Sequence, residues 1–327
     1  MWPEHLWSSE SEWQCGQVVR LPGMPTVDVA GYLQRLGLGD SGTADIDTLR
    51  AVHAAHAERV AYEVLWIWGG QAPQVTTNPY EAAERIVAHH RGGYCYHLNG
   101  ALSLLLSELG FDVVWHRAGV QNREESNPPG AGRANHLALT VHGLPSGDNP
   151  AGDWFVDVGL GDALHEPLPL QEGVYEQGPF RFALRSSEVE PGGWRFEHDP
   201  KGSFIGMDFR PSRATEADFT DRHIFLSTSP QSGFVRVCTV QRRDATGVDI
   251  LRGCHLSRVG GASDGGSGGG RTLETSREWY EVLADLFGLP MTDASATYRD
   301  QLWRRVRQAH DAWLARRDMT DLSQADG

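Results

Sequence analysis

The stretch Arg91–Leu106, RGGYCYHLNGALSLLL, places a cysteine between a pair of glycines and a run of leucines. Apolar residues continue from Leu98 to Leu109 at helical spacing, and Gly110 follows as a stop signal. The pattern predicts a helix that begins close to Cys95. The first N–H groups of a helix carry partial positive charge, which favours a thiolate. Cys95 is therefore either a small buried hydrophobic residue or a nucleophile at a helix start.

Composition and charge place the chain among folded globular proteins. Its 327 residues, 40% of them hydrophobic, are enough for two or three domains with a buried core. The net charge of −14 argues against nucleic acid as a partner, because nucleic-acid binding needs a basic face. The four cysteines form no CxxC pair and no metal-ligand spacing, so we expect free thiols and no metal site.

Signals for membrane insertion or export are missing from the pattern. No stretch approaches 18 consecutive apolar residues. The first residues, MWPEHLWSSESEWQCGQ, have neither the basic nor the apolar region of a signal peptide. We therefore expect a cytoplasmic protein without membrane contact.

The periodicity of apolar residues changes along the chain. Residues 1–26 are polar and rich in tryptophan, and we interpret them as an N-terminal extension. Helical spacing dominates to about residue 110, and from there alternating residues predict strands. The predicted strands are FDVVWHRAGV (111–120), HLALTVHG (136–143), DWFVDVGLG (153–161), FRFALRS (180–186), WRFEHD (194–199) and FVRVCTVQRR (234–243). A glycine-rich loop at 260–271 precedes two C-terminal helical segments.

A nucleophilic thiol needs an imidazole within hydrogen-bond reach, and the imidazole needs an orienting carboxylate. His136 begins a predicted strand, and Asp157 lies between valines in the next one, so a hairpin would make them neighbours. His97 is closer in sequence, but two positions on a helix correspond to about 200° of rotation away from Cys95. From spacing alone, Cys95 as packing and His136 and Asp157 as ordinary polar strand residues remain open.

Several segments together resemble one enzyme family. RGGYCYHLN resembles the RGGxCxELN signature of the arylamine N-acetyltransferases, and NHLALTV and VDVGLGD resemble that family's histidine and aspartate strands. EPLPL, STSPQSGFVRVCTVQRR and LADLFGL resemble further family segments in the same order. The resemblance runs from about Val27 to Met291. It implies an α+β fold of three domains with a cysteine-protease-like core: a helical bundle (27–112), a β-barrel (113–215) and an α/β lid (216–327).

The resemblance also implies an activity. Cys95, His136 and Asp157 would form a catalytic triad that transfers an acyl group through a thioester on Cys95. The donor would be acetyl-CoA or another acyl-CoA, and the acceptor a small aromatic amine or hydrazine. Related amide synthases of antibiotic pathways use a carrier-bound acyl chain, so an acyl-carrier protein is the alternative partner. Hydrolysis by the same triad and a degenerate binding module are further alternatives.

The resemblance implies roles for other residues around the cysteine. Glu63 and Arg91 match an ion pair that braces the cysteine loop, with an exposed surface pair of little energetic value as the alternative. Gly92 and Gly93 leave that loop without Cβ atoms, so that backbone and substrate can approach closely. The segment that contacts the coenzyme in relatives is matched by Thr228, Ser232, Gly233 and Phe234, with a plain strand and loop as the alternative.

Three departures from the family pattern concern the predicted acceptor pocket. His97 stands where the family has Glu, Tyr62 where it has Phe, and Leu160 where it has Phe. The resemblance places all three in or beside the acceptor pocket, although Tyr62 could equally be a core residue. We expect these changes to affect the identity of the amine more than the acylation of Cys95.

Overall fold

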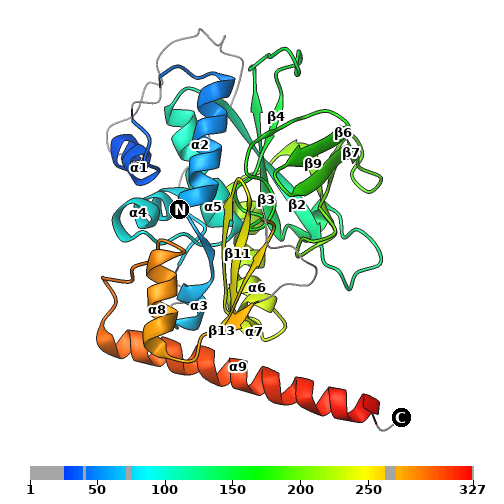
Figure 1. The fold of residues 1–327 in the computed structure, drawn as a ribbon. Coiled ribbons are helices and arrows are strands. Elements are labelled where there is room, and N and C mark those ends of the chain that lie inside the picture. Colours follow the sequence, from blue (N-terminus) through cyan, green and yellow to red (C-terminus); the bar gives the residue numbers. More distant parts are fainter. Residues whose placement is uncertain (1–25, 40–41, 71–74, 262–269, 326–327) are drawn as a thin grey trace, which may run out of the picture.

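The computed structural model describes residues 26–39, 42–70, 75–261 and 270–325 (Figure 1). The predicted N-terminal extension lies outside these ranges except for residue 26, as does most of the glycine-rich loop. The N-terminal part is helical. Its helices are α1 (Val29–Arg35), α2 (Ile46–Arg59), α3 (Leu65–Trp68), α4 (Pro79–His89) and α5 (Cys95–Glu108). Asp28, Asp45 and Asn78 cap α1, α2 and α4 by accepting hydrogen bonds from first-turn N–H groups, as their side chains favour.

An antiparallel eight-stranded sheet follows and curls into a nearly closed barrel, to the right of the helices in Figure 1. Its strands are β2 (Asp112–Gln121), β3 (His136–His142), β4 (Trp154–Val156), β5 (Leu168–Pro169), β6 (Gly173–Gln177), β7 (Phe180–Ser186), β8 (Trp194–Glu197) and β9 (Gly206–Arg213). They lie in the order β5-β4-β3-β2-β9-β8-β7-β6. Phenylalanines fill the barrel, among them Phe155, Phe196 and Phe209.

The strand β3 is buried on both faces, and this positions the site. Leu137, Leu139 and Val141 pack with the apolar residues of α5, whereas Ala138 belongs to the barrel core. The apolar face of α5 therefore rests directly on the strand that begins with His136.

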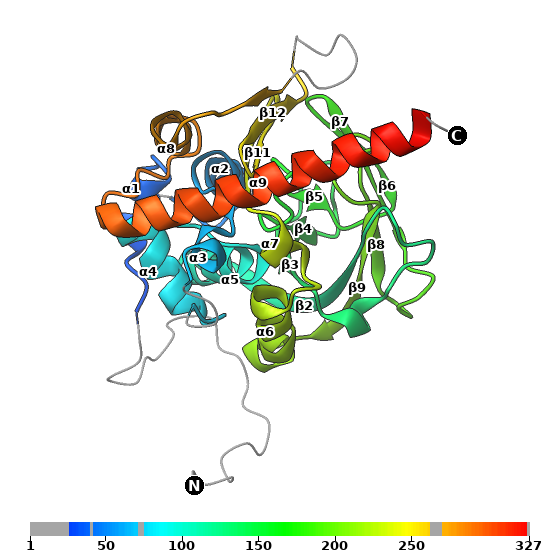
Figure 2. The same cartoon turned by 90° about the horizontal axis from the view of Figure 1, so that it is seen from below.

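A third region joins both others. Its antiparallel sheet has the order β1 (Tyr62–Glu63), β10 (Thr239–Asp244), β11 (Gly247–Arg252), β12 (His255–Val259) and β13 (Arg271–Thr272). Its helices are α6 (Thr220–Thr228), α7 (Gly233–Arg236), α8 (Ser276–Asp285) and α9 (Ala296–Ala325). Viewed from below, α9 lies across the face of the molecule, where Arg305 donates to the carbonyl oxygen of Trp68 over 3.0 Å (Figure 2).

Two predicted strands are partly wrong. Of the segment 153–161, only Trp154–Val156 is a strand, and Asp157 lies in the loop that follows, because its side chain accepts a hydrogen bond from the N–H of Gly159 and turns the chain. Of the segment 234–243, only the part from Thr239 is a strand, and Phe234–Arg236 belong to helix α7. Ser232 is the reason, because its side chain accepts a hydrogen bond from the N–H of Phe234 over 3.2 Å and caps a helical turn. The α+β architecture of helices, barrel and α/β region is confirmed. The domain limits at 27, 113 and 216 stay a prediction.

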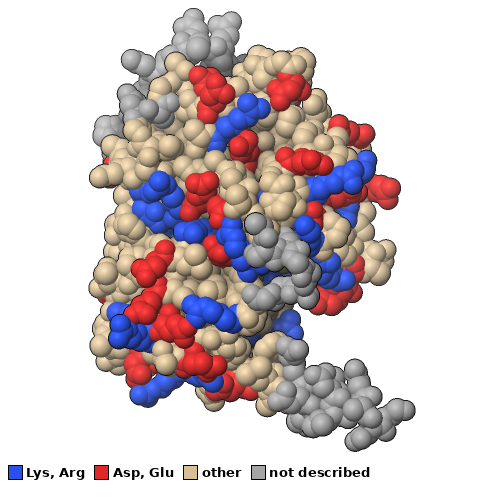
Figure 3. Space-filling view, viewed as in Figure 1, with Lys and Arg blue, Asp and Glu red and all other residues tan. Residues whose placement is uncertain are grey.

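The surface carries charges of both signs. On the face seen in Figure 3, basic and acidic side chains alternate, and neither sign dominates a large area. Within the described ranges, no helix combines the length and apolar character that a membrane crossing requires.

Candidate active site

The cysteine lies at the start of a buried helix. Cys95 is the first residue of α5 and is 3% exposed, and its Sγ is 3.8 Å from the carbonyl oxygen of Asn135. Tyr94 precedes it with an extended backbone, and its N–H donates to Nδ1 of His97 over 3.3 Å. His97, the third residue of α5, thus satisfies the N–H of the N-cap residue Tyr94, a task that Glu commonly performs at this helix position.

His136 lies between the cysteine and an acidic residue. Its Nε2 is 2.6 Å from Oδ2 of Asp157, and the side chain of Cys95 is close enough to the ring to favour its charged form. Burial alone would lower the pKa of His136, but the charges of Asp157 and Cys95 and the hydrogen bonds to both raise it to about 10. The structure therefore brings the three predicted residues together in the order nucleophile, imidazole and carboxylate.

Two residues that the sequence did not single out hold the carboxylate. Asn99, one turn after Cys95, donates from Nδ2 to Oδ1 of Asp157 over 2.9 Å and to the carbonyl oxygen of Leu137 over 2.6 Å. The N–H of Gly159 also donates to Oδ1 of Asp157, over 2.9 Å. A Cβ at Gly159 would lie 2.6 Å from Cα of Cys95, so only glycine lets the loop approach the helix start this closely.

The predicted pair of Glu63 and Arg91 forms in the interior. Nε and Nη2 of Arg91 each lie 3.3 Å from a carboxylate oxygen of Glu63, which is fully buried. Burial would lower the pKa of Arg91, but the Glu63 carboxylate raises it. The alternative of an exposed pair is wrong, because the side chains are 8% and 0% exposed.

Both glycines of the cysteine loop lie in tight contacts. A Cβ at Gly92 would lie 2.0 Å from the carbonyl oxygen of Ala61. Gly93 has a φ of +145°, and a Cβ there would lie 2.5 Å from Nδ1 of His97. The loop therefore needs glycine at both positions to pass between β1 and α5.

The segment predicted to bind coenzyme lies next to the site, around α7. The hydroxyl of Ser232 donates to the carbonyl oxygen of Leu226 over 2.6 Å, and that of Thr228 to Ile224 over 2.6 Å. Gly233 is exposed, with open space where a Cβ would be. The ring of Phe234 stacks on Tyr94 at 5.0 Å between centroids. Ser232 and Thr228 thus serve the local backbone, whereas Gly233 faces open space and Phe234 lies beside the residue that precedes Cys95.

The three residues predicted for the acceptor pocket separate in the structure. Tyr62 lines a small cavity together with Asp157 and Gly161. His97 is fully buried, and its ring packs edge-on against Trp66 at 5.6 Å between centroids. Burial lowers its pKa well below the usual value, and the nearby Arg85 acts in the same direction. Leu160 packs in the barrel core. Neither His97 nor Leu160 lines the cavity beside Asp157.

The arrangement can perform nucleophilic acyl transfer. A thiol at a helix start, an imidazole beside it and a carboxylate that orients the imidazole are the components that such chemistry requires. Among the described residues, no group of three or more His, Cys, Asp or Glu side chains is placed to hold a metal ion.

Comparison with known proteins gives a consistent set of relatives. A family model described as N-acetyltransferase matches residues 45–296. Arylamine N-acetyltransferase of Mycolicibacterium smegmatis is 32% identical over 226 residues, covering 65% of this chain and 76% of the relative. Proansamycin X synthase of Amycolatopsis mediterranei is 30% identical over 168 residues, covering 51% and 61%. The structure of Mycobacterium marinum arylamine N-acetyltransferase in complex with CoA superposes with a TM-score of 0.73 at 25% identity, covering 86% of this chain and 99% of that one.

Proposed function

The chain belongs to the arylamine N-acetyltransferase family, and we propose that it transfers an acyl group from a CoA thioester, through a thioester on Cys95, to an aromatic amine or hydrazine. One observation carries this proposal: Nε2 of His136 lies 2.6 Å from Oδ2 of Asp157, and Cys95 is near enough to the same imidazole to raise its pKa. The relative solved in complex with CoA supports the donor class.

The reaction has two half-reactions with balanced protons. In the first, the thiolate of Cys95 attacks the carbonyl carbon of the acyl thioester, the bond from that carbon to the CoA sulfur breaks, and His136 gives its proton to the departing sulfur. In the second, the amine nitrogen attacks the Cys95 thioester, His136 takes a proton from the nitrogen, and the Cys95 thiolate leaves. Asp157 orients the imidazole and stabilises its charge, which agrees with the raised pKa of His136.

A second candidate is amide synthesis from an acyl chain bound to a carrier protein. The similarity to Proansamycin X synthase favours this reading. The same triad chemistry would apply, because only the group that bears the donor sulfur differs.

Intact-protein mass spectrometry tests the nucleophile and the donor together. The protein is incubated with acetyl-CoA, with longer acyl-CoAs and with acyl-carrier thioesters. We expect an acyl adduct on the wild type and on Cys238→Ala, whose cysteine is buried away from the triad, and none on Cys95→Ala. An adduct on Cys95→Ala contradicts the assignment, and an adduct from carrier thioesters alone selects the second candidate.

The acceptor is tested in the second half-reaction. Acylated protein is mixed with a panel of amines, and loss of the adduct is followed in a single turnover. We expect slow transfer to simple anilines and faster transfer to a bulkier amine, because Tyr62 stands close to Asp157 at a position where the family pattern has Phe. Transfer to small anilines as fast as acylation would show that the departures from the family pattern do not redirect the acceptor.

A further inference from the structure

A buried histidine of α2 lies behind the loop that carries Asp157. His53 is fully buried, and its Nε2 is 3.2 Å from the backbone nitrogen of Asp157. A backbone N–H can only donate, so Nε2 is the acceptor and the ring hydrogen of the neutral imidazole lies on Nδ1. Nδ1 is 2.9 Å from the carbonyl oxygen of His165, which can only accept. The two contacts together fix one neutral tautomer.

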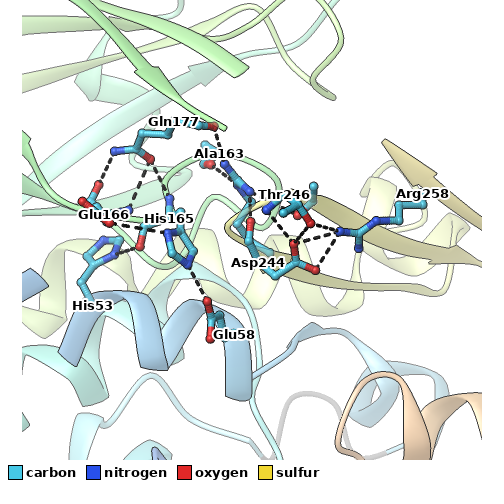
Figure 4. Close-up of polar contacts among 11 residues, drawn as sticks. His53, Glu58, Ala163, His165, Glu166, Gln177, Asp244, Thr246 and Arg258 are labelled. Carbon is cyan, nitrogen blue, oxygen red and sulfur yellow. Dashed lines mark hydrogen bonds and ion pairs between the residues drawn. The ribbon is translucent and has the colours of Figure 1, made fainter. Parts of the chain in front are cut away.

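Helix α2 therefore fastens both ends of the loop 157–165. His53 binds the backbone at each end, and Glu58, on the same helix, accepts from Nε2 of His165 over 2.7 Å. Figure 4 shows His53 and Glu58 reaching from α2 toward His165, with Gln177 on the opposite side. The side-chain oxygen of Gln177 accepts from the backbone N–H of His165 over 2.8 Å, so that end of the loop is held from two sides.

The contact to Asp157 needs the ring to be neutral. Burial lowers the pKa of His53 to about 4, and the nearby His165 adds to this effect, while the His165 carbonyl and Asp157 oppose it. A protonated ring would turn a donor toward the N–H of Asp157. His56, on the same helix, is the other titratable neighbour, and burial lowers its pKa as well.

His53 binds the N–H of Asp157 just beyond the end of the strand, where no strand pairing supports the backbone. Strand β4 ends at Val156, and its paired residues stop there. Asn99 and Gly159 hold the carboxylate, whereas His53 holds the main chain from the other side. Without His53, the N–H of Asp157 would be buried without an acceptor, and the main chain would be free to shift toward another one.

We propose that His53 is a positioning residue for acyl transfer, which keeps the carboxylate of Asp157 aligned with His136 by fixing the backbone of Asp157. The proposal rests on the function proposed above for the triad. The hydrogen bonds of His53 go to the backbone of Asp157 and His165 and not to the thiol, so its effect on the rate is exerted through Asp157.

Two substitutions separate its two contacts. The side-chain oxygen of His53→Gln can replace Nε2 as the acceptor for Asp157, whereas the amide of His53→Asn can replace Nδ1 as the donor to His165. If the contact to Asp157 matters, the Gln variant keeps thiol reactivity and the Asn variant loses it. His56 supplies the matched control, because it is equally buried on α2 but its Nε2 contacts the hydroxyl of Tyr32 over 2.9 Å.

The experiment measures the rate of Cys95 alkylation by iodoacetamide against pH in the full-length protein, with thermal unfolding of each variant recorded alongside. For His53→Asn we expect reactivity near pH 6.5 to fall roughly tenfold or more and the rise in rate to move to higher pH, since a misplaced catalytic group can cost up to about a hundredfold. For His53→Gln we expect a profile within about twofold of the wild type. For His56→Asn and His56→Gln we expect equal profiles.

The comparison of pH profiles tests the role of His53 even if one of the variants is less stable. Equal profiles for His53→Asn and His53→Gln overturn the proposal, as does an Asn-to-Gln difference of the same size at His56. If His53→Asn does not fold, His53→Leu takes its place, because it also lacks the acceptor for Asp157. Failure of the function proposed for the triad would give a different result. In that case His136→Ala would alkylate at the same rate as the wild type near neutral pH.

Discussion

The side-chain amide of Asn99 donates to Oδ1 of Asp157 over 2.9 Å, one helical turn beyond Cys95 on the same helix. The helix that presents the nucleophile therefore also fixes the acid of the proposed triad. Oδ1 of Asn99 accepts from the N–H of Val158 over 2.9 Å, so the same side chain holds the main chain after Asp157.

Replacing Asn99 should affect both stability and thiol reactivity. Asn99→Ala leaves buried partners at Leu137, Asp157 and Val158 without their hydrogen bonds, which should cost about 2–4 kcal/mol of unfolding free energy. Urea unfolding and the alkylation rate of Cys95 measure the two effects. Asn149→Ala is the control, because Asn149 is also buried but donates to the carbonyl oxygen of Asp153. Normal thiol reactivity in Asn99→Ala would contradict a role in aligning Asp157.

The raised pKa of His136 predicts how stability depends on pH. Its value in the folded protein, about 10, lies above the ordinary value of about 6.5 expected in the unfolded chain. The folded state thus binds the proton more tightly, so the stabilisation is fully present below about pH 6.5 and is lost as pH rises toward 10. We expect the difference in unfolding free energy between wild type and His136→Gln to shrink between pH 6.5 and 10 in denaturant titrations. A difference that grows with pH would show that His136 is not held as an imidazolium.

Gly159 should tolerate no side chain. The Cβ of Gly159→Ala would meet Cα and Cβ of Cys95 at 2.6 and 2.9 Å, and backbone atoms of a buried helix cannot easily move away. Overpacking of this kind typically costs about 1–3 kcal/mol. We expect slower acylation of Cys95 in a mass-spectrometric time course and a lower melting temperature. Gly147→Ala, which has open space at the Cβ position, should change neither, and equal behaviour of the two variants would refute the close approach.

The buried pair of Glu63 and Arg91 should be costly to break. Glu63→Gln leaves the Arg91 guanidinium buried without its counter-charge, and losses of about 3–5 kcal/mol are usual for such changes. The double variant Glu63→Leu/Arg91→Met should recover part of the loss, as chemical unfolding would show. Arg185→Ala breaks the pair with Glu197, whose side chains are 53% and 41% exposed, and should cost less than about 1 kcal/mol. Similar losses for Glu63→Gln and Arg185→Ala would contradict the buried geometry.

The sequence predicted those parts of the site that lie on strongly patterned elements. The leucine periodicity and Gly110 locate α5. The alternation of Leu137, Leu139 and Val141 with smaller or polar residues locates β3, because these large apolar side chains pack on the same side, toward α5. The family resemblance then selected Cys95, His136 and Asp157 from several candidates. In contrast, the segment FVRVCTVQRR suggested a strand over 234–243, although a capping side chain at Ser232 determines a helical turn at Gly233–Arg236.

The supporting contacts could not be predicted from the pattern. His53 acts on a backbone N–H, which nearly every residue possesses, and its partner Asp157 lies far along the chain. Gly159 matters only because α5 passes beside it, and that approach is a property of the packed structure.

The strand β12 is half-buried along its whole length, so its residues show no alternation of apolar and polar side chains.

The short strand β1 has a consequence for the order in which the protein assembles. Tyr62 pairs with Gln241 of β10, and the N–H of Glu63 donates to the carbonyl oxygen of Gly93 in the cysteine loop over 2.9 Å. Strand β1, which borders the cysteine loop, therefore pairs with β10, a strand that the ribosome synthesises much later. Contacts between such distant segments form slowly, because a long intervening loop must first close. A nascent chain that ends after the barrel would carry Cys95 without β10, so its thiol should acquire native reactivity only once the C-terminal third has been synthesised and has folded back.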